Sequence, residues 1–535
     1  MNNAIILSFA RQEAGELPVR LVVKKASGDG YRVSKSGGGW VVTGNNARSC
    51  LYGVYHLQGK PETGTFRTPW KIRGIYPCET LNRHTPEQMR RLIDRMGKWR
   101  FNTFVVYTHY GYGEHIALIE EECAKRGIDL VYYYNTSFRF MQKLTPGKHF
   151  AKDAGGKPYC DTLMCITRPC FADSVVQERI EAAIKTFFRK ELPQHHRTLL
   201  FAPADGVKVC SCPSCRRLTP MEQWEVVQRG INAFMKRYAN DRVQWSQIYV
   251  QRYRPPADLS SYDRVDRIFF DTHQRERWHA LGEAHPYEPG IEAKVDWAAR
   301  LTPQNVYLLD RIDEWRHRVG KPVVVFENLM LQGTFSCGQF NTSVLLRDLR
   351  VLQQAGVDGM LYEAFEPGME IFAPEFGHLA KAMWDPHYRY RPTRLESWIL
   401  GQLADPKKQL PADIRDAANR LVSVLPGFPW RAAEQELGAV HAEHLRRFGK
   451  FWMAPSVANA AAVVDHLYAN PDRFDSMFTS FVTLRRVFQL KGLSGLTPEE
   501  TRYLSYLKLW DFMEEQANPR RVVNDLNLSI RAKLG

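Results

Sequence analysis

The middle of the chain alternates strand-like and helix-like segments, and this alternation restricts the fold more than any other feature. The eight predicted strands, all mostly apolar, are residues 71–77, 102–108, 128–134, 197–203, 244–250, 267–273, 322–328 and 359–365. Apolar residues with helical spacing lie between most of them, at 86–99, 115–127, 175–190, 221–239, 305–320 and 343–356. This order predicts an α/β fold, a closed (β/α)8 TIM barrel. An open doubly wound sheet is the main alternative, but no Gly-rich dinucleotide fingerprint marks the switch point that such a sheet needs.

The segments on either side of the barrel have different patterns. Residues 1–68 predict a small α/β domain, with short strands at 4–9, 19–25, 31–37 and 40–44 and a helix from NARSCLYGVYHLQG. Gly37, Gly38 and Gly39 suit a hairpin turn, and residues 60–69 read as a linker. The barrel is assigned to residues 69–394. Residues 395–535 carry helical spacing throughout and predict an α-helical domain.

Composition and charge narrow the classes of partner. Of the 535 residues, 44% are apolar and 24% are charged, which is typical of a globular protein. The 73 Lys and Arg exceed the 58 Asp and Glu by 15, which favours an anionic partner such as an acidic glycan. Nucleic acid is disfavoured because the basic runs lack regular aromatic interleaving. No apolar stretch approaches the ~20 residues needed to span a bilayer, so no membrane partner is expected.

In such a barrel, catalytic residues lie at the C-terminal ends of the strands and in the loops that follow. Polar residues at these positions are Glu79, Tyr107, His109, Tyr110, Tyr134, Asn135, Asp205, Gln251, Arg252, Asp271, His273, Glu327, Asn328, Glu363 and Glu366. Several carboxylates and tyrosines around one opening match glycosidic chemistry, in which one acid protonates the leaving oxygen and a second group stabilises the oxocarbenium-like centre. Any single one of these residues could instead be solvated or cap a helix.

Three segments resemble known glycoside hydrolases. Residues 73–110, RGIYPCETLNRHTPEQMRRLIDRMGKWRFNTFVVYTHY, resemble the opening of the barrel in family 20 β-N-acetylhexosaminidases. SCLYGVYHLQG (49–59) resembles the helix that closes the small domain before those barrels and before α-glucuronidase barrels. Residues 163–215 are similar to bacterial proteins related to the family 163 endo-β-N-acetylglucosaminidases, which share an Asp-Gly followed by Cys-x-Cys-x-x-Cys.

The resemblance implies roles for individual residues. By position, Arg73 would grip hydroxyls of the terminal sugar, with a salt bridge closing the barrel floor as the alternative. Asp205 falls where the hexosaminidases have an Asp that polarises the substrate acetamido group, which acts as the nucleophile. Their next residue, the catalytic Glu, is Gly206 here. The general acid must therefore come from another strand end, and Glu327 is the first choice.

The other strand-end candidates are assigned to substrate binding. Glu363 or Glu366 lies near the position where a Glu of the last strand binds outer sugar hydroxyls in those enzymes. The complete expected substrate-binding set, besides Arg73, is Glu79, Tyr110, Tyr134, Asp271, His273, Tyr362, Glu363 and Glu366.

A cluster of cysteines follows the strand that carries Asp205. Cys210-Ser-Cys212-Pro-Ser-Cys215 presents three thiols within six residues. A fourth thiol from Cys160, Cys165 or Cys170 would complete a tetrahedral structural zinc site, and Cys165 is taken as the fourth ligand. Free thiols and a disulfide are the alternatives. No cofactor is expected for catalysis.

These observations predict a glycoside hydrolase that removes an N-acetylated or acidic sugar from complex glycans, in the manner of a β-N-acetylhexosaminidase. An exo-glycosidase for an anionic sugar, a sialidase or glucuronidase, is one alternative. A barrel that binds glycans without cleaving them is the other. The N-terminus has no basic segment before a long apolar run, so the expected location is cytoplasmic, or secreted or periplasmic if a leader has been removed. The helical C-terminal domain could form a homodimer surface.

Overall fold

A computed structural model describes most of the N-terminal three quarters of the chain. The described residues are 2–77, 86–108, 112–140, 149–158, 169–203, 210–249, 252–272, 275, 280–283, 305–327, 342–363, 373–391, 443, 446 and 447. Nearly all of them belong to one compact unit, made of residues 1–328, 344–366 and 375–389. The second unit comprises 329–343, 367–374 and 390–535. The predicted α-helical domain at 395–535 therefore lies outside the described residues, apart from 443, 446 and 447.

The N-terminal region is a small α/β domain, as predicted. Its sheet has the order β1 (Val19–Val23), β3 (Gly39–Gly44), β2 (Gly30–Ser36) and β4 (Gly64–Arg67), with β1 parallel to β3 and the other pairs antiparallel. Positive φ angles of 57° at Gly37 and 82° at Gly38 make the predicted hairpin turn between β2 and β3. Helix α2 (Ala47–Gly59) packs closely on this sheet, since a Cβ at Gly53 would lie 2.3 Å from a methyl group of Val42.

Two predictions for this domain are wrong. Residues 4–9 do not form a strand but belong to helix α1 (Asn3–Ala14), because Ile6, Ala10 and Ala14 recur at a four-residue interval and are buried together. The Asn2 side chain caps this helix by accepting a hydrogen bond from the Ala4 amide at 3.0 Å. The predicted linker at 60–69 contains β4, which pairs with β2 and extends the sheet.

The central region is a closed barrel of eight parallel strands, which confirms the predicted (β/α)8 architecture. Going around it, the strands are β5 (Ile72–Tyr76), β6 (Thr103–Tyr107), β7 (Asp129–Asn135), β8 (Thr198–Ala202), β9 (Val243–Ile248), β10 (Arg267–Asp271), β11 (Val323–Glu327) and β12 (Gly359–Glu363). Each pairs with the next along the chain, and β12 pairs with β5 to close the ring. All eight coincide with segments predicted as strands.

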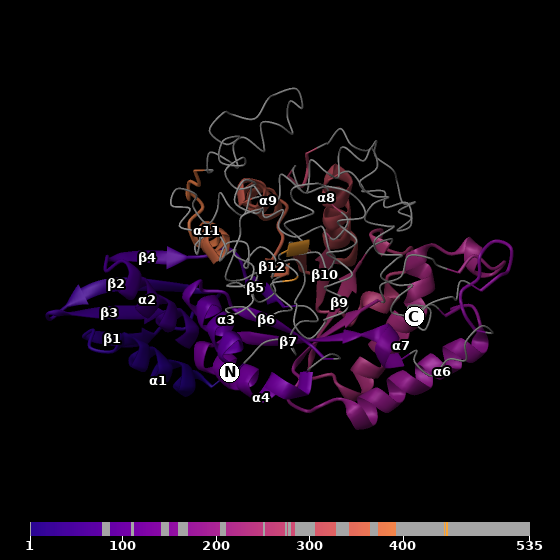
Figure 1. The fold of residues 1–535 in the computed structure, drawn as a ribbon, viewed down its shortest axis with the longest axis horizontal. Coiled ribbons are helices and arrows are strands. Elements are labelled where there is room, and N and C mark those ends of the chain that lie inside the picture. The colour runs from indigo at the N-terminus through magenta and orange to yellow at the C-terminus, as the bar shows by residue number, and fades with distance from the viewer. Residues whose placement is uncertain are drawn as a thin grey trace. The chain divides into compact units, whose positions relative to one another are not determined.

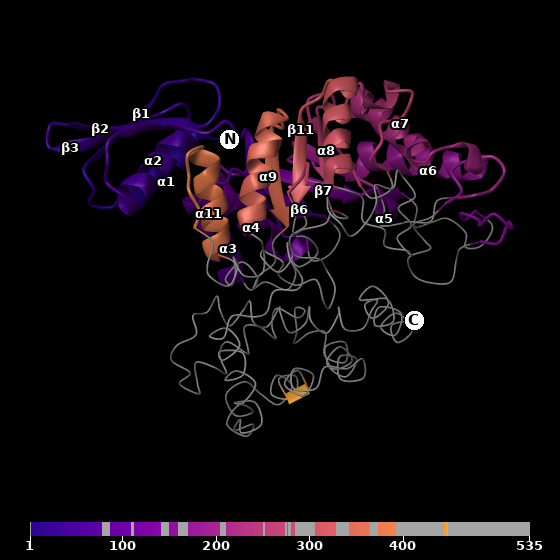
Figure 2. The ribbon, with the colours of Figure 1, turned by 90° about the horizontal axis from the view of Figure 1, so that it is seen from above.

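Helices surround these strands (Figures 1 and 2). They are α3 (Pro86–Lys98), α4 (Tyr112–Arg126), α5 (Thr136–Phe140), α6 (Ser174–Thr186), α7 (Pro220–Tyr238), α8 (Asn305–Glu314), α9 (Thr342–Gln354) and α11 (Ala373–Trp384). Segments of π-helix, Phe187–Glu191 and Trp315–Val319, extend α6 and α8. Since strands of this kind are covered by helices outside and by one another inside, they are apolar on both faces. None of the helices within the described ranges has the length and apolar character needed to cross a membrane.

Candidate active site

The side chains inside the barrel can be identified from the strand register. Paired residues on neighbouring parallel strands point to the same side, and successive residues of one strand alternate between sides. The ring of Tyr76 on β5 contacts the rings of Tyr133 on β7 (5.3 Å) and Phe326 on β11 (5.2 Å), and since neither strand is a neighbour of β5, these side chains meet inside the barrel. Inward side chains toward the C-terminal ends of the strands include Tyr76, Tyr107, Tyr133, Gln247, Asp271, Phe326 and Glu363. All seven are buried.

Two carboxylates belong to this inward layer. Asp271 is the last residue of β10, and its Oδ2 accepts a hydrogen bond of 2.8 Å from the Nε2 of Gln247 on β9. Glu363 is the last residue of β12 and lies in register with Tyr76 of β5. A buried amide donor fixes the orientation of the Asp271 carboxylate. The two acids therefore end strands on the inner face, where a parallel barrel places its chemistry.

Stacked aromatic rings form the rest of the layer. The ring centroids of Tyr76 and Tyr133 are 5.3 Å apart, and those of Tyr107 and Tyr133 are 5.0 Å apart. Phe326 lies 5.2 Å from Tyr76 on the other side. These rings give the barrel an apolar face beside the two carboxylates, which suits the apolar face of a sugar ring. Tyr76, Tyr133, Gln247 and Phe326 are not among the residues predicted from the sequence. The signal that identifies them is their position along the strands, which puts them on the same face as Asp271 and Glu363.

Glu327, the predicted general acid, does not face the interior. Its Oε2 accepts hydrogen bonds from the Thr272 hydroxyl (2.8 Å) and from Arg275 (3.0 Å). The same guanidinium donates to Asp348 on α9 at 2.5 Å. Glu327 is thus a buried ion-pair partner between the barrel and its helices, because it has the opposite parity to the inward Phe326. The assignment of Glu327 as the catalytic acid is corrected on this ground.

Asp348 shows that burial between the barrel and its helices disfavours the charged form of a carboxyl group. Burial raises the pKa of its carboxyl to about 6, against the opposing effect of Arg275. The Leu281 amide also donates to it, at 2.7 Å. Arg275 therefore holds two buried carboxylates together outside the barrel wall.

Tyr134 and Tyr362 also point away from the interior, which corrects their assignment to substrate binding. The Tyr134 hydroxyl lies 2.6 Å from Nδ1 of His196, and its ring packs against Phe187 with centroids 4.9 Å apart. Tyr362 is fully buried, with its ring 6.0 Å from Phe376 of α11. Both residues have the parity of the outward positions and stabilise the helix layer.

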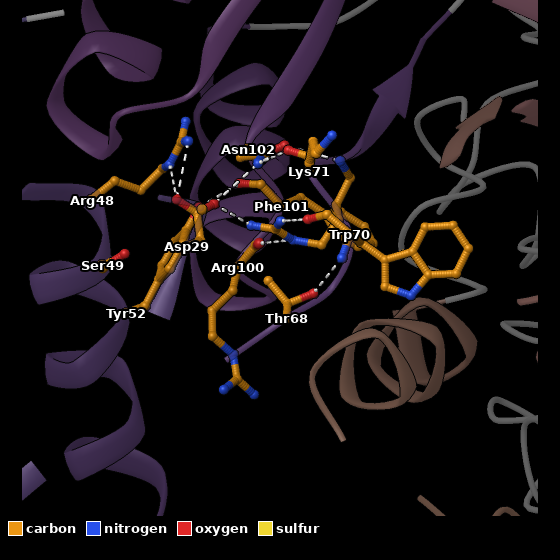
Figure 3. A network of polar contacts seen from close by, with 12 residues as sticks. Asp29, Arg48, Ser49, Tyr52, Thr68, Trp70, Lys71, Arg100, Phe101 and Asn102 are labelled. Atoms are coloured by element: carbon orange, nitrogen blue, oxygen red, sulfur yellow. Dashed lines mark hydrogen bonds and ion pairs between the residues drawn. The ribbon is translucent and has the colours of Figure 1, made fainter. Parts of the chain in front are cut away.

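Arg73 lies on the outward face of β5 and has no exposed surface. Its guanidinium donates to Asp29 Oδ2 at 2.6 Å, to the Arg100 carbonyl at 3.1 Å and to the Trp70 carbonyl. Figure 3 shows Asp29 between Arg48 and Asn102, which also donate to it. The contacts fit the alternative of a salt bridge at the barrel floor, and the sugar-binding role of Arg73 is corrected.

Six predicted site residues lie outside the described residues. They are Glu79, Tyr110, Cys165, Asp205, His273 and Glu366. Of the predicted metal ligands, Cys210, Cys212 and Cys215 come together, and the fourth thiol among the described residues is Cys170. Because Cys165 lies outside the described residues, its participation stays a prediction, and Cys170 is the thiol that the described residues bring to the other three.

Comparisons with known proteins give similarities at the level of structure. No family model matches the chain, and no curated protein matches it. One similar solved structure is a GH138 enzyme targeting pectin rhamnogalacturonan II, with 11% identity and a TM-score of 0.44, covering 95% of this chain and 66% of that one. Another is the GH20 exo-β-N-acetylglucosaminidase of Vibrio harveyi, with 10% identity and a TM-score of 0.45, covering 76% and 73%.

A third is a GH89 protein of Clostridium perfringens in complex with GlcNAc-α-1,4-galactose, with 12% identity and a TM-score of 0.46, covering 91% of this chain and 60% of that one. This chain thus spans less than two thirds of the length of the first and third of these proteins. Family 20 enzymes, which the sequence resembles, are among the similar structures. The barrel itself is established by its strand pairing, and these similarities do not decide an activity.

Proposed function

We propose that the chain is a glycoside hydrolase that cleaves an N-acetylated or acidic sugar from complex glycans, with β-N-acetylhexosaminidase-like action as the first choice. The observation that carries this proposal is the pair Asp271 and Glu363, which end β10 and β12 with inward side chains in a closed parallel barrel. Carboxylates at this end of such a barrel are placed for chemistry rather than for packing.

Glycosidic cleavage needs a proton donor and a group that stabilises positive charge at the anomeric carbon. We assign the proton donor to Glu363, in place of Glu327. It would protonate the leaving oxygen as the C1–O bond breaks. Asp271, oriented by Gln247, would stabilise the positive charge. Asp205 keeps the role that its position in the sequence suggests, polarising an acetamido group whose oxygen attacks C1.

The aromatic rings of the inward layer supply the binding surface that this chemistry requires. Tyr76, Tyr107 and Tyr133 form one continuous stack. A sugar ring has an apolar C–H face that packs on such rings, while its hydroxyls need polar partners. Stacked tyrosines beside two carboxylates offer both kinds of contact.

Two alternatives remain. The net charge of +15 favours a substrate with an anionic sugar, such as a sialic or uronic acid. Arg252, one of the polar residues at the strand ends, could pair with such a carboxylate, and it lies over the Trp224 ring of α7 at 5.8 Å. Gly206 in place of the expected Glu favours the other alternative, a barrel that binds glycans without cleaving them.

The test begins with hydrolysis of nitrophenyl glycosides of N-acetylglucosamine, glucuronic acid and sialic acid, together with release from intact N-glycans. For the substrate that is cleaved, Asp271→Asn and Glu363→Gln should each lower kcat by about 10²–10⁴, the usual contribution of a positioned acid or base. The matched controls Asp241→Asn and Glu181→Gln change exposed carboxylates and should retain full activity.

Circular dichroism and thermal melting of every variant separate loss of chemistry from loss of folding. If Glu363→Gln is folded and turns over at the rate of the wild type, the acid assignment is wrong. If no substrate is cleaved, the hydrolase proposal fails for these sugar classes. Glycan binding measured on the same preparation then decides whether the non-catalytic alternative holds.

A further inference from the structure

Four cysteine sulfurs come together from two loops of the chain. Cys170, which precedes α6, meets Cys210, Cys212 and Cys215, which follow β8. All four Sγ atoms lie within 4.8 Å of one another. Three of the four side chains are buried, and Cys212 is partly exposed.

The spacing of the sulfurs matches tetrahedral metal coordination. Zinc–thiolate bonds are about 2.3 Å long, so the sulfurs of a regular ZnS4 tetrahedron are about 3.8 Å apart. The Cys170 sulfur lies 3.8 Å from that of Cys212 and 3.7 Å from that of Cys215. A disulfide would require about 2.05 Å. The cluster therefore has the dimensions of a metal site and not those of two cystines.

Backbone amides point at the sulfurs. The Lys152 amide donates to Cys210 Sγ at 3.4 Å, and the Cys215 amide donates to Cys212 Sγ at 3.5 Å. Two of the four sulfurs thus accept an N–H, and an N–H donor favours a thiolate over a thiol. Thiolates are the form that binds metal.

Neighbouring side chains hold the ligands in place without competing for the metal. Gln223 of α7 accepts a hydrogen bond from the Cys210 amide and donates to the carbonyls of Cys210 and Cys215, all at 3.1 Å. The Ser211 amide donates to the Lys152 carbonyl at 2.7 Å, which ties the two loops together. Such support of ligand orientation is typical of built metal sites.

We propose that Cys170, Cys210, Cys212 and Cys215 bind one Zn²⁺ ion in a closed tetrahedral site. Four thiolates leave no position for substrate or water, so the site is structural. It joins the loop before α6 to the segment after β8, two parts of the chain that are 40 residues apart between Cys170 and Cys210. The inference does not depend on the proposed glycosidase activity.

The test measures zinc in the full chain, produced in zinc-supplemented medium and purified under reducing conditions without a metal-affinity tag. Elemental analysis should give one zinc per chain for the wild type and for Cys123→Ala, a buried cysteine outside the cluster. Cys212→Ser and Cys170→Ser should lose the metal. Less than about half an equivalent of zinc in the wild type, or full zinc in Cys212→Ser, would overturn the proposal.

A second measurement on the wild type covers the case in which the variants do not fold. Titration with an organomercurial should release zinc in step with the modification of four thiols, as followed by a zinc-sensitive dye. Cobalt substitution should produce thiolate-to-metal charge-transfer bands and the d–d bands of a tetrahedral site. Iron in place of zinc, or octahedral cobalt bands, would contradict the assignment.

Discussion

The ion pair between Asp29 and Arg73 should contribute strongly to stability, and Asp29→Asn tests this. The substitution keeps the size of the side chain and removes its charge. In the native protein the Asp29 side chain is 3% exposed and that of Arg73 is 0% exposed, so water does little to screen the pair. The carboxylate also accepts hydrogen bonds from Asn46 and Asn102, at 3.0 and 3.1 Å.

The expected loss follows from leaving a buried guanidinium without its counter-charge. Breaking one side of a buried ion pair usually costs about 3–5 kcal/mol. For a chain of this size each kcal/mol lowers Tm by about 1 °C, so a decrease of about 3–5 °C is expected. The guanidinium of Arg73 keeps its hydrogen bonds to the carbonyls of Trp70 and Arg100 in this variant. The expected loss of unfolding free energy is therefore in the lower half of that range, about 3–4 kcal/mol.

The pH dependence of stability is a second, independent test of the Asp29–Arg73 ion pair. Burial alone would raise the pKa of Asp29, but Arg48 and Arg73 lower it well below its usual value of 3.8. Such a group contributes stability that is present above about pH 4 and is lost as the pH falls further. The difference in Tm between wild type and Asp29→Asn should therefore be largest near neutral pH and should narrow in acid.

The assay is thermal and urea unfolding of wild type, Asp29→Asn and Arg73→Met, with Asp241→Asn as the control. Asp241 pairs with Arg197 on the surface, where both side chains are more than half exposed. Its loss should cost less than about 1 kcal/mol. If Asp29→Asn unfolds no more easily than Asp241→Asn, the reasoning is refuted. If Arg73→Met keeps its Tm but raises KM, the sugar-binding role of Arg73 must be restored.

Three further predictions concern the barrel wall. Gly74→Ala should destabilise by about 3 kcal/mol or more, because its methyl group would lie 1.8 Å from a backbone oxygen of β6, whereas Gly59→Ala, with open space around it, should unfold like wild type in urea. Burial lowers the pKa of His196 to about 3, so stability should fall as the pH drops below 6.5, by about 2 kcal/mol at pH 5, and His196→Gln should remove this trend from melting curves. Arg275→Met should lower the free energy of unfolding in urea by about 3–5 kcal/mol, because it leaves two buried carboxylates without their counter-charge. Glu327→Gln should lower Tm, while the folded protein keeps its kcat. A stable but inactive Glu327→Gln would contradict the structural role of Glu327.

The architecture of the barrel could be predicted because strand and helix patterns alternate along the chain with little interruption. The local pattern gave a wrong prediction where the same residues suit either a strand or a helix. The run at 4–9 is apolar enough for a strand, and only the capping Asn2 and the interval between Ile6, Ala10 and Ala14 identify a helix. Strand β4 has just four residues and exists because it pairs with β2, from which it is separated by α2 and β3. No local pattern carries that pairing.

The proposed zinc ligands show the same limit. Cys210, Cys212 and Cys215 are close in sequence and could be grouped directly. The fourth thiol depends on how the preceding loop returns to the cluster, which the bridge between Phe150 and Pro169 determines. That contact brings Cys170 to the cluster, whereas the spacing of the cysteines along the chain does not identify which of them is the fourth member.

For the proposed catalytic residues, the sequence does not tell whether a side chain at a strand end faces into the barrel or out toward the helices. A shift of one residue along the strand reverses the answer. Glu327 and Glu363 both end apolar strands, and because such strands are apolar on both faces, the sequence does not say which face each acid occupies. A charge on the outer face is covered by helices and must be paired there, as Glu327 is by Arg275 and Arg73 is by Asp29. A charge on the inner face at the C-terminal end faces the barrel opening, as Glu363 does. Asp271 and Glu363 have the inward parity and Glu327 has the outward one, and it is this difference that makes the first two the carboxylates proposed for catalysis.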